Sequence, residues 1–268
     1  MKTILSPIAV LLAAALCIPA GAAEKLTARQ IMQKQKDLHK TTSEIEFQKM
    51  MLIDRKGDKE LRELRRYNLE TGKDLYKYLL VFLSPKDIRG TSLLTWQKEG
   101  GEDDQWIYMP ALGRKLKRMA KGSKKGYFMG TDFTYADLSP EPLDDNTYKL
   151  IGEEKLEGQE VWIIESTPVP AKLQASAYSK KVLRVRKDIF FTVQIEFYNP
   201  RGKHIKTQTM SGIKQIQGTI HRADKALMDH LQREHKTVMM VTERELNAKV
   251  DPEIFSERSV LKEETLGN

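Results

Sequence analysis

Along most of this chain apolar residues recur at every second position, which is the spacing of a half-buried β-strand. The stretch from Ile45 to Ile53 alternates in this way. Leu61 to Leu69 form a densely charged strand, which favours a solvated outer face or a sheet edge. Leu75 to Leu83 are apolar on both faces and end before Pro85, so they predict a central strand.

Further strands are expected in short apolar or alternating runs that polar turns separate. They lie at 93–96, 105–110, 115–119, 148–153, 161–166, 182–186, 190–198 and 203–210. The charges from His221 to His235 could also sit on a helix, but Met228 and Leu231 form no helical stripe. Because the run 238–241 after them is strand-like, a β-hairpin is the favoured interpretation.

Two helices frame these strands. Thr27 is a good N-cap for a helix from Ala28 to His39, and Asp251-Pro252 can start a short C-terminal helix. About ten short strands without a βαβ rhythm predict a mainly β protein with a single curved antiparallel sheet. Since a large sheet protects its edges by curvature or closure, we expect a partial barrel with a helix packed on its concave side.

The first 23 residues have a basic start, a short apolar run and a string of small residues, the layout of a secretory signal peptide. The run is too short for a transmembrane helix, which needs about 20 apolar residues. Cleavage near Ala22 or Ala23 would leave one exported, periplasmic domain at 24–268. The alternative is a lipid anchor on Cys17, although Leu16 stands where a lipobox has a small residue.

Composition narrows the function classes. Cys17 is the only cysteine, so the exported chain lacks thiol nucleophiles, thiolate metal sites and disulfides. The formal net charge of +8, with 31% charged residues, favours anionic surfaces such as lipid headgroups. We expect no nucleic-acid partner, because an exported protein rarely meets one.

Positive charge is concentrated in one stretch. It could dock an anionic membrane or an acidic partner, or it could be an ordinary solvated strand and loop. Its members are Arg114, Lys115, Lys117, Arg118, Lys121, Lys124 and Lys125. An aromatic run from Tyr127 to Tyr135 follows directly. It predicts either a mobile flap over an apolar cavity or a plug at one end of the barrel.

No local motif indicates catalysis. Gly122 to Gly126 is not a nucleophile elbow, because the serine stands one position early. His221, His230 and His235 lack the regular spacing of zinc ligands. We therefore expect no enzyme, no metal and no cofactor. A carboxylate pair for glycoside hydrolysis needs no local motif, so an exported hydrolase acting on envelope lipids or glycans stays as an alternative.

Three segments, 83–91, 104–112 and 128–138, resemble the outer-membrane lipoprotein-sorting protein family, which is related to the LolA and LolB periplasmic lipoprotein carriers. The resemblance implies an unclosed antiparallel β-barrel with helices as a lid and an apolar cavity for acyl chains. Many members of the family accompany RND-type lipid exporters. The chain is longer than a LolA carrier and differs strongly from it in sequence, which leaves the cargo open.

The resulting hypothesis is a periplasmic carrier that binds a lipid or lipid-modified cargo and moves it between the inner and outer membranes. An acyl chain needs only an apolar lining, since each buried CH₂ contributes about 0.8 kcal/mol. Candidate lining residues are Phe47, Met51, Tyr78, Phe82, Trp96, Trp106, Tyr108, Phe128, Phe133, Phe191, Ile195 and Phe197. A further alternative is a non-transporting adaptor of an RND-type exporter.

Overall fold

The computed structural model describes residues 25–113, 115–120 and 122–262. The predicted signal peptide and Cys17 lie outside these residues, as do Arg114 and Lys121. Thirteen strands of the described chain form one antiparallel sheet, a few more than expected. They are β1 (Ser43–Ile53), β2 (Lys59–Gly72), β3 (Leu75–Ser84), β4 (Ser92–Trp96), β5 (Asp104–Met109), β6 (Lys115–Arg118), β7 (Asn146–Leu156), β8 (Gln159–Pro168), β9 (Lys180–Arg186), β10 (Phe191–Tyr198), β11 (His204–Gln217), β12 (Ile220–His230) and β13 (His235–Leu246).

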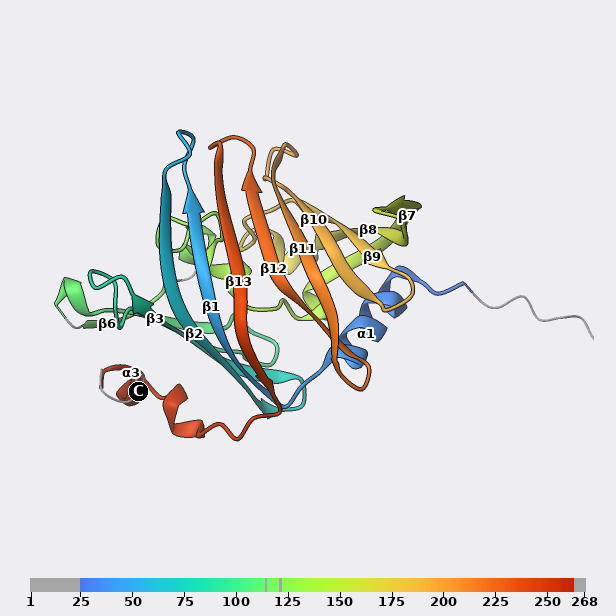
Figure 1. The fold of residues 1–268 in the computed structure, drawn as a ribbon. Helices are drawn as coiled ribbons and strands as arrows, with labels where there is room; N and C mark the ends of the chain where they lie inside the picture. The colour runs from blue at the N-terminus through green and yellow to red at the C-terminus, as the bar shows by residue number, and fades with distance from the viewer. Residues whose placement is uncertain (1–24, 114, 121, 263–268) are drawn as a thin grey trace, which may run out of the picture.

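The sheet curves round without closing into a barrel, as predicted (Figure 1). Its order is β6-β5-β4-β3-β2-β1-β13-β12-β11-β10-β9-β8-β7, so β1 pairs with β13 and the edges are β6 and β7. The chain therefore leaves the sheet at one edge and re-enters at the other. The connection between β6 and β7 must span the open side of the half-barrel.

The predicted helix α1 (Ala28–His39) is confirmed, with a capping box between Thr27 and Gln30. Ala28, Ile31 and Met32 pack it against Ile164, Leu183 and Val185 of β8 and β9. The C-terminal helix consists of a 3-10 turn, η5 (Pro252–Phe255), followed by one α-helical turn, α3 (Glu257–Val260). The remaining short helices are η1 (Pro110–Leu112), η2 (Ser123–Lys125), η3 (Tyr135–Leu138), η4 (Leu143–Asp145) and α2 (Pro170–Leu173).

Both faces of the sheet are largely buried at β3, β4 and β5, which explains why β3 is apolar throughout. Leu80 and Phe82 belong to the concave cluster, whereas Leu79 and Val81 belong to a convex cluster. The C-terminal segment covers the convex side, where the Trp96 Nε1–H donates to the Phe255 carbonyl at 2.8 Å. The concave cluster is formed by Met50, Leu52, Leu64, Leu80, Phe82, Leu93, Ile107, Phe128, Phe133, Leu138, Tyr178, Phe197, Ile205, Met228 and Met239.

Candidate functional site on the concave face

Residues 126–138, the crossing segment, cover the concave cluster. Phe128 and Phe133 of this segment are 0% and 3% exposed. The Phe128 ring stacks on Phe82 of β3, with 5.7 Å between the ring centroids. The Phe128 N–H donates to the Phe133 carbonyl at 2.8 Å, so both rings come from one tight turn. In this structure the aromatic run packs as a plug on the concave side.

Arginines of β2 hold the crossing segment from one side. Arg62 Nη1 donates to the Met129 carbonyl at 2.6 Å, and Arg66 Nη2 donates to the Leu138 carbonyl at 3.1 Å. The expectation of a sheet edge for this strand was wrong, because β2 lies between β1 and β3, whereas a solvated outer face agrees with the exposed Leu61 and the half-exposed Glu63. Its inward positions carry charge because they bind the carbonyl groups of a segment that has no strand partner in the sheet.

A buried ion pair holds the crossing segment from β11. The Lys206 side chain is 0% exposed, and its Nζ lies 2.7 Å from Asp137 Oδ2 and 2.8 Å from the Asp132 carbonyl. The Tyr178 hydroxyl donates to the same Asp137 oxygen at 2.9 Å. Burial would raise the pKa of Asp137, but the charges of Lys206 and Lys181 outweigh it and hold that pKa below its usual value.

Strands β12 and β13 add a third set of anchors. The Thr237 hydroxyl donates to Asp132 Oδ2 at 2.8 Å, and His235 Nδ1 lies 2.6 Å from the same oxygen. Tyr127 OH and His230 Nε2 are 2.6 Å apart. Burial lowers the pKa of His230, which favours the neutral imidazole in this contact. Polar side chains thus fix an irregular segment that the sheet itself does not pair.

Charged residues occupy the concave face at the N-terminal end of β1, where Glu44 and Glu46 lie. Arg222 Nη2 lies 2.9 Å from Glu44 Oε2, and Arg244 Nε lies 2.7 Å from Glu46 Oε1. Burial raises the pKa of Glu44. The concave face is therefore apolar along one end of the strands and charged along the other. The sequence did not indicate this network, because the alternating apolar positions of β1 from Ile45 to Ile53 lie on its convex side.

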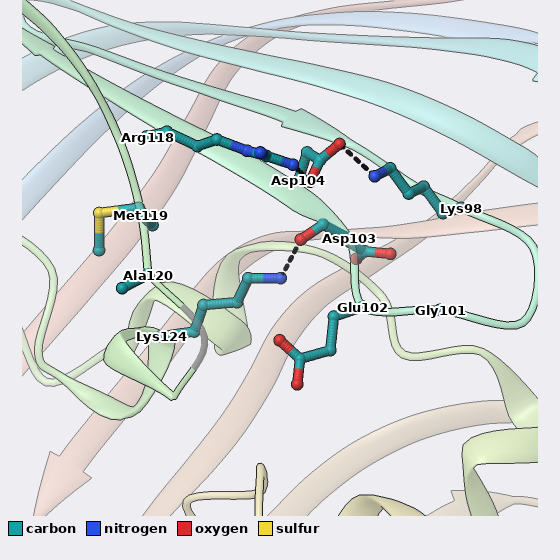
Figure 2. Close-up of a pocket in the computed structure, with 9 residues that line it drawn as sticks. All are labelled: Lys98, Gly101, Glu102, Asp103, Asp104, Arg118, Met119, Ala120 and Lys124. Atoms are coloured by element: carbon teal, nitrogen blue, oxygen red, sulfur yellow. Dashed lines mark hydrogen bonds and ion pairs between the residues drawn. The ribbon is translucent and has the colours of Figure 1, made fainter.

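A pocket of about 520 Å³ opens at the mouth of the half-barrel, between the β4–β5 turn, residues 118–120 and Lys124. We call it the mouth pocket (Figure 2). Asp104 is held there by Arg118 and by Lys98, whose Nζ lies 2.5 Å from Asp104 Oδ2. Its lining residues are Lys98, Gly101, Glu102, Asp103, Asp104, Arg118, Met119, Ala120 and Lys124.

Two further charges of the mouth pocket are partly desolvated. Lys124 Nζ donates to the backbone carbonyl of Asp103, as Figure 2 shows. Burial raises the pKa of the Asp103 carboxyl and lowers the pKa of Lys124. Among the described residues, neither side chain has an ion-pair partner within 4.0 Å.

A narrower pocket of about 130 Å³ shares Asp103 and Lys124 with the mouth pocket. Its other walls include Gln105, Ala177 and Tyr178. Since Tyr178 and Ala177 also pack in the concave cluster, this space leads from the mouth towards the crossing segment.

The predicted lining residues divide between the two faces of the sheet. Tyr78, Phe82, Phe128, Phe133, Ile195 and Phe197 lie on the concave side. Trp96, Trp106 and Tyr108 pack in the convex cluster, and strand alternation places Phe47 and Met51 on that side with Ile45. Phe191 lies against His39 at the end of α1, with 5.3 Å between ring centroids. One concave cavity could therefore include only about half of the predicted set.

The predicted basic residues also have different environments. Lys115 and Lys117 are exposed on the edge strand β6. Arg118 and Lys124 line the mouth pocket, and Lys125 Nζ donates to the Gln174 carbonyl on the opposite side of the mouth. In the part of the chain that the structure describes, no helix is long and apolar enough to cross a membrane, and no cluster of acidic, histidine or cysteine side chains is arranged to hold a metal ion.

An open antiparallel half-barrel with a covered concave face defines the fold class, and solved structures share it. An outer membrane lipoprotein-sorting protein domain from Vibrio parahaemolyticus is 28% identical with a TM-score of 0.82, covering 87% of this chain and 98% of its own. A DUF1329 family protein from Desulfovibrio piger is 24% identical with a TM-score of 0.81, covering 87% and 97%. A LolA superfamily protein from Nitrosomonas europaea is 17% identical with a TM-score of 0.70, covering 88% and 100%.

Residues 74–262 match a protein family whose description is "Uncharacterized protein". The chain belongs to this family, and its predicted resemblance to the outer-membrane lipoprotein-sorting and LolA proteins is confirmed. Among curated proteins, none matches the chain.

Proposed function

We propose that this protein is a periplasmic carrier that binds the acyl chains of a lipid or lipid-modified cargo on its concave face. One observation carries the proposal: the concave apolar cluster is covered by the crossing segment, which polar side chains hold and the sheet does not pair. Such a segment can move aside without breaking a strand-to-strand ladder. Its departure would open an apolar surface inside a rigid half-barrel.

An acyl chain would take the place of Phe128, Phe133 and Leu138, which fill this surface in the closed protein. The exchange of one apolar group for another costs little, and each CH₂ removed from water contributes about 0.8 kcal/mol. Binding of this kind requires no catalytic group, so we propose a carrier rather than an enzyme. The lipoprotein-sorting name of the Vibrio relative supports the same cargo class.

The location and the partners belong to the same proposal. A signal peptide cleaved near Ala22 or Ala23 would release the carrier into the periplasm, where it could move between the two membranes. The exposed Lys115 and Lys117 would meet anionic headgroups at either membrane. An RND-type exporter in the inner membrane is the partner that would load or receive the cargo.

The carrier hypothesis is tested on protein exported to a bacterial periplasm and purified without detergent. Mass spectrometry of the intact complex should detect bound acyl lipids, and a fluorescent fatty acid should bind and be displaced by them. Protein that carries no lipid and binds no acyl probe would overturn the proposal.

A further inference from the structure

Both signs of charge line the mouth pocket. Asp104 pairs with both Lys98 and Arg118, so this trio carries one net positive charge. Asp103 and Lys124 face the same space and form no ion pair within 4.0 Å among the described residues, although their charges act on one another across it. Glu102 lies beside the same space in Figure 2. The pocket therefore presents two carboxylates and an ammonium group that lie close together without a direct ion pair.

Desolvation makes this arrangement costly in the empty protein. Burial disfavours the charged forms of both Asp103 and Lys124. A partly buried charge is stabilised when a ligand brings the opposite charge to it. A wholly anionic ligand would be repelled by Asp103 and Glu102, and a wholly cationic one by Lys124. A ligand that carries both charges satisfies both ends of the pocket.

The position of the pocket connects it with the acyl site. It shares Asp103 and Lys124 with the narrower pocket, whose lining includes Tyr178, a hydrogen-bond partner of Asp137 in the crossing segment. A volume of about 520 Å³ falls within the range of small-molecule sites, about 300–1,000 Å³. A polar head group in the mouth pocket and a tail on the concave face would therefore be neighbouring parts of one ligand.

We propose that the mouth pocket binds a zwitterionic head group in which a primary ammonium lies near a phosphate, with the ammonium against Asp103 and Glu102 and the phosphate against Lys124. This inference rests on the proposed carrier function and narrows its cargo to zwitterionic phospholipids. Wholly anionic phospholipids of the same chain length would bind more weakly.

Two measurements distinguish binding of the head group from binding of the acyl chains. In the first, native mass spectrometry follows competition between phosphatidylethanolamine and phosphatidylglycerol with identical acyl chains. The wild type should prefer the ethanolamine lipid by about tenfold, the effect of one charge-assisted hydrogen bond. In the second, NMR follows the titration of glycerophosphoethanolamine and glycerophosphoglycerol, which lack acyl chains.

The double variant Asp103→Asn with Lys124→Met should lose the preference while its binding of a fluorescent fatty acid persists. The matched control is Lys155→Met with Glu157→Gln, which removes the same two charges at the β7–β8 turn. Equal binding of the two lipids by the wild type, or a preference that survives in the pocket variant, would overturn the head-group assignment alone. Failure to bind either lipid or the fatty acid would overturn the carrier function, and the soluble head groups would then decide the pocket by themselves.

Discussion

Lys206 is a positive charge with no exposed surface, and its only anionic partner among the described residues is Asp137. Rings of Phe197 and Tyr178 surround its Nζ at 4.9 and 5.2 Å from their centroids. Removing one member of a buried ion pair leaves the other uncompensated. We expect Lys206→Met to lower the free energy of unfolding by about 3–5 kcal/mol, measured by urea denaturation.

A double-mutant cycle with Asp137→Asn is the control. The double variant should lose less free energy of unfolding than the two single variants lose together, and additive losses would contradict the pairing.

The contribution of Asp137 to stability depends on pH with a fixed sign. Because the folded-state pKa of Asp137 lies below its ordinary value, its contribution is complete above about pH 4 and is lost as the pH falls through the folded-state pKa. Asp137→Asn should lack this part of the acid loss.

At the scale of elements, the crossing segment decides whether the concave face is available. Asp132 lies on the segment and Thr237 on β13, with their side-chain oxygens 2.8 Å apart. Residues 24–268 contain no cysteine, so Asp132→Cys with Thr237→Cys introduces a single thiol pair. Oxidation should tie the segment to the sheet and abolish binding of a fluorescent fatty acid, and reduction should restore it.

Probe binding by the double cysteine variant is compared between its oxidised and reduced states. The single variant Thr237→Cys, treated with the same oxidant, should bind the probe in both states. Undiminished binding by the oxidised pair, with the cross-link confirmed by mass spectrometry, would show that the acyl chain does not require movement of the segment.

At the scale of the whole molecule, each edge of the sheet carries a pair of exposed lysines. Lys115 and Lys117 are exposed on β6, and Lys149 and Lys155 are exposed on β7 at the other edge. If β6 faces the membrane, replacing its two lysines by glutamine should weaken binding to anionic vesicles by about 30-fold, at about 1 kcal/mol per lysine. Vesicle co-sedimentation at fixed salt measures this.

The variant Lys149→Gln with Lys155→Gln removes the same charge from the opposite edge and should bind vesicles like the wild type. If both variants lost the same amount of vesicle binding, net charge alone would attract the protein, and β6 would not be the edge that faces the membrane. Binding to neutral vesicles as strong as to anionic ones would contradict an electrostatic contact altogether.

Much of the fold follows from local pattern. Alternation located the strands, Thr27 located α1, and the apolar run of β3 indicated a strand buried on both faces. Each of these three signals can be read from a few consecutive residues. The candidate site was less accessible, because alternation shows that two residues share a face without showing which face is concave. Phe47 and Phe82 were equivalent in sequence, yet they lie on opposite sides of the sheet.

By itself, the sequence determined a cysteine-poor, basic, mainly β chain with a single curved sheet and an aromatic run between two groups of strands. Only the tertiary structure decided that β1 pairs with β13, which makes β6 and β7 the edges and sends the aromatic run across the concave face. That choice also turned Arg62 and Lys206 inward as anchors. The physical reason is that strand order and buried ion pairs depend on partners more than sixty residues apart, which no local period records.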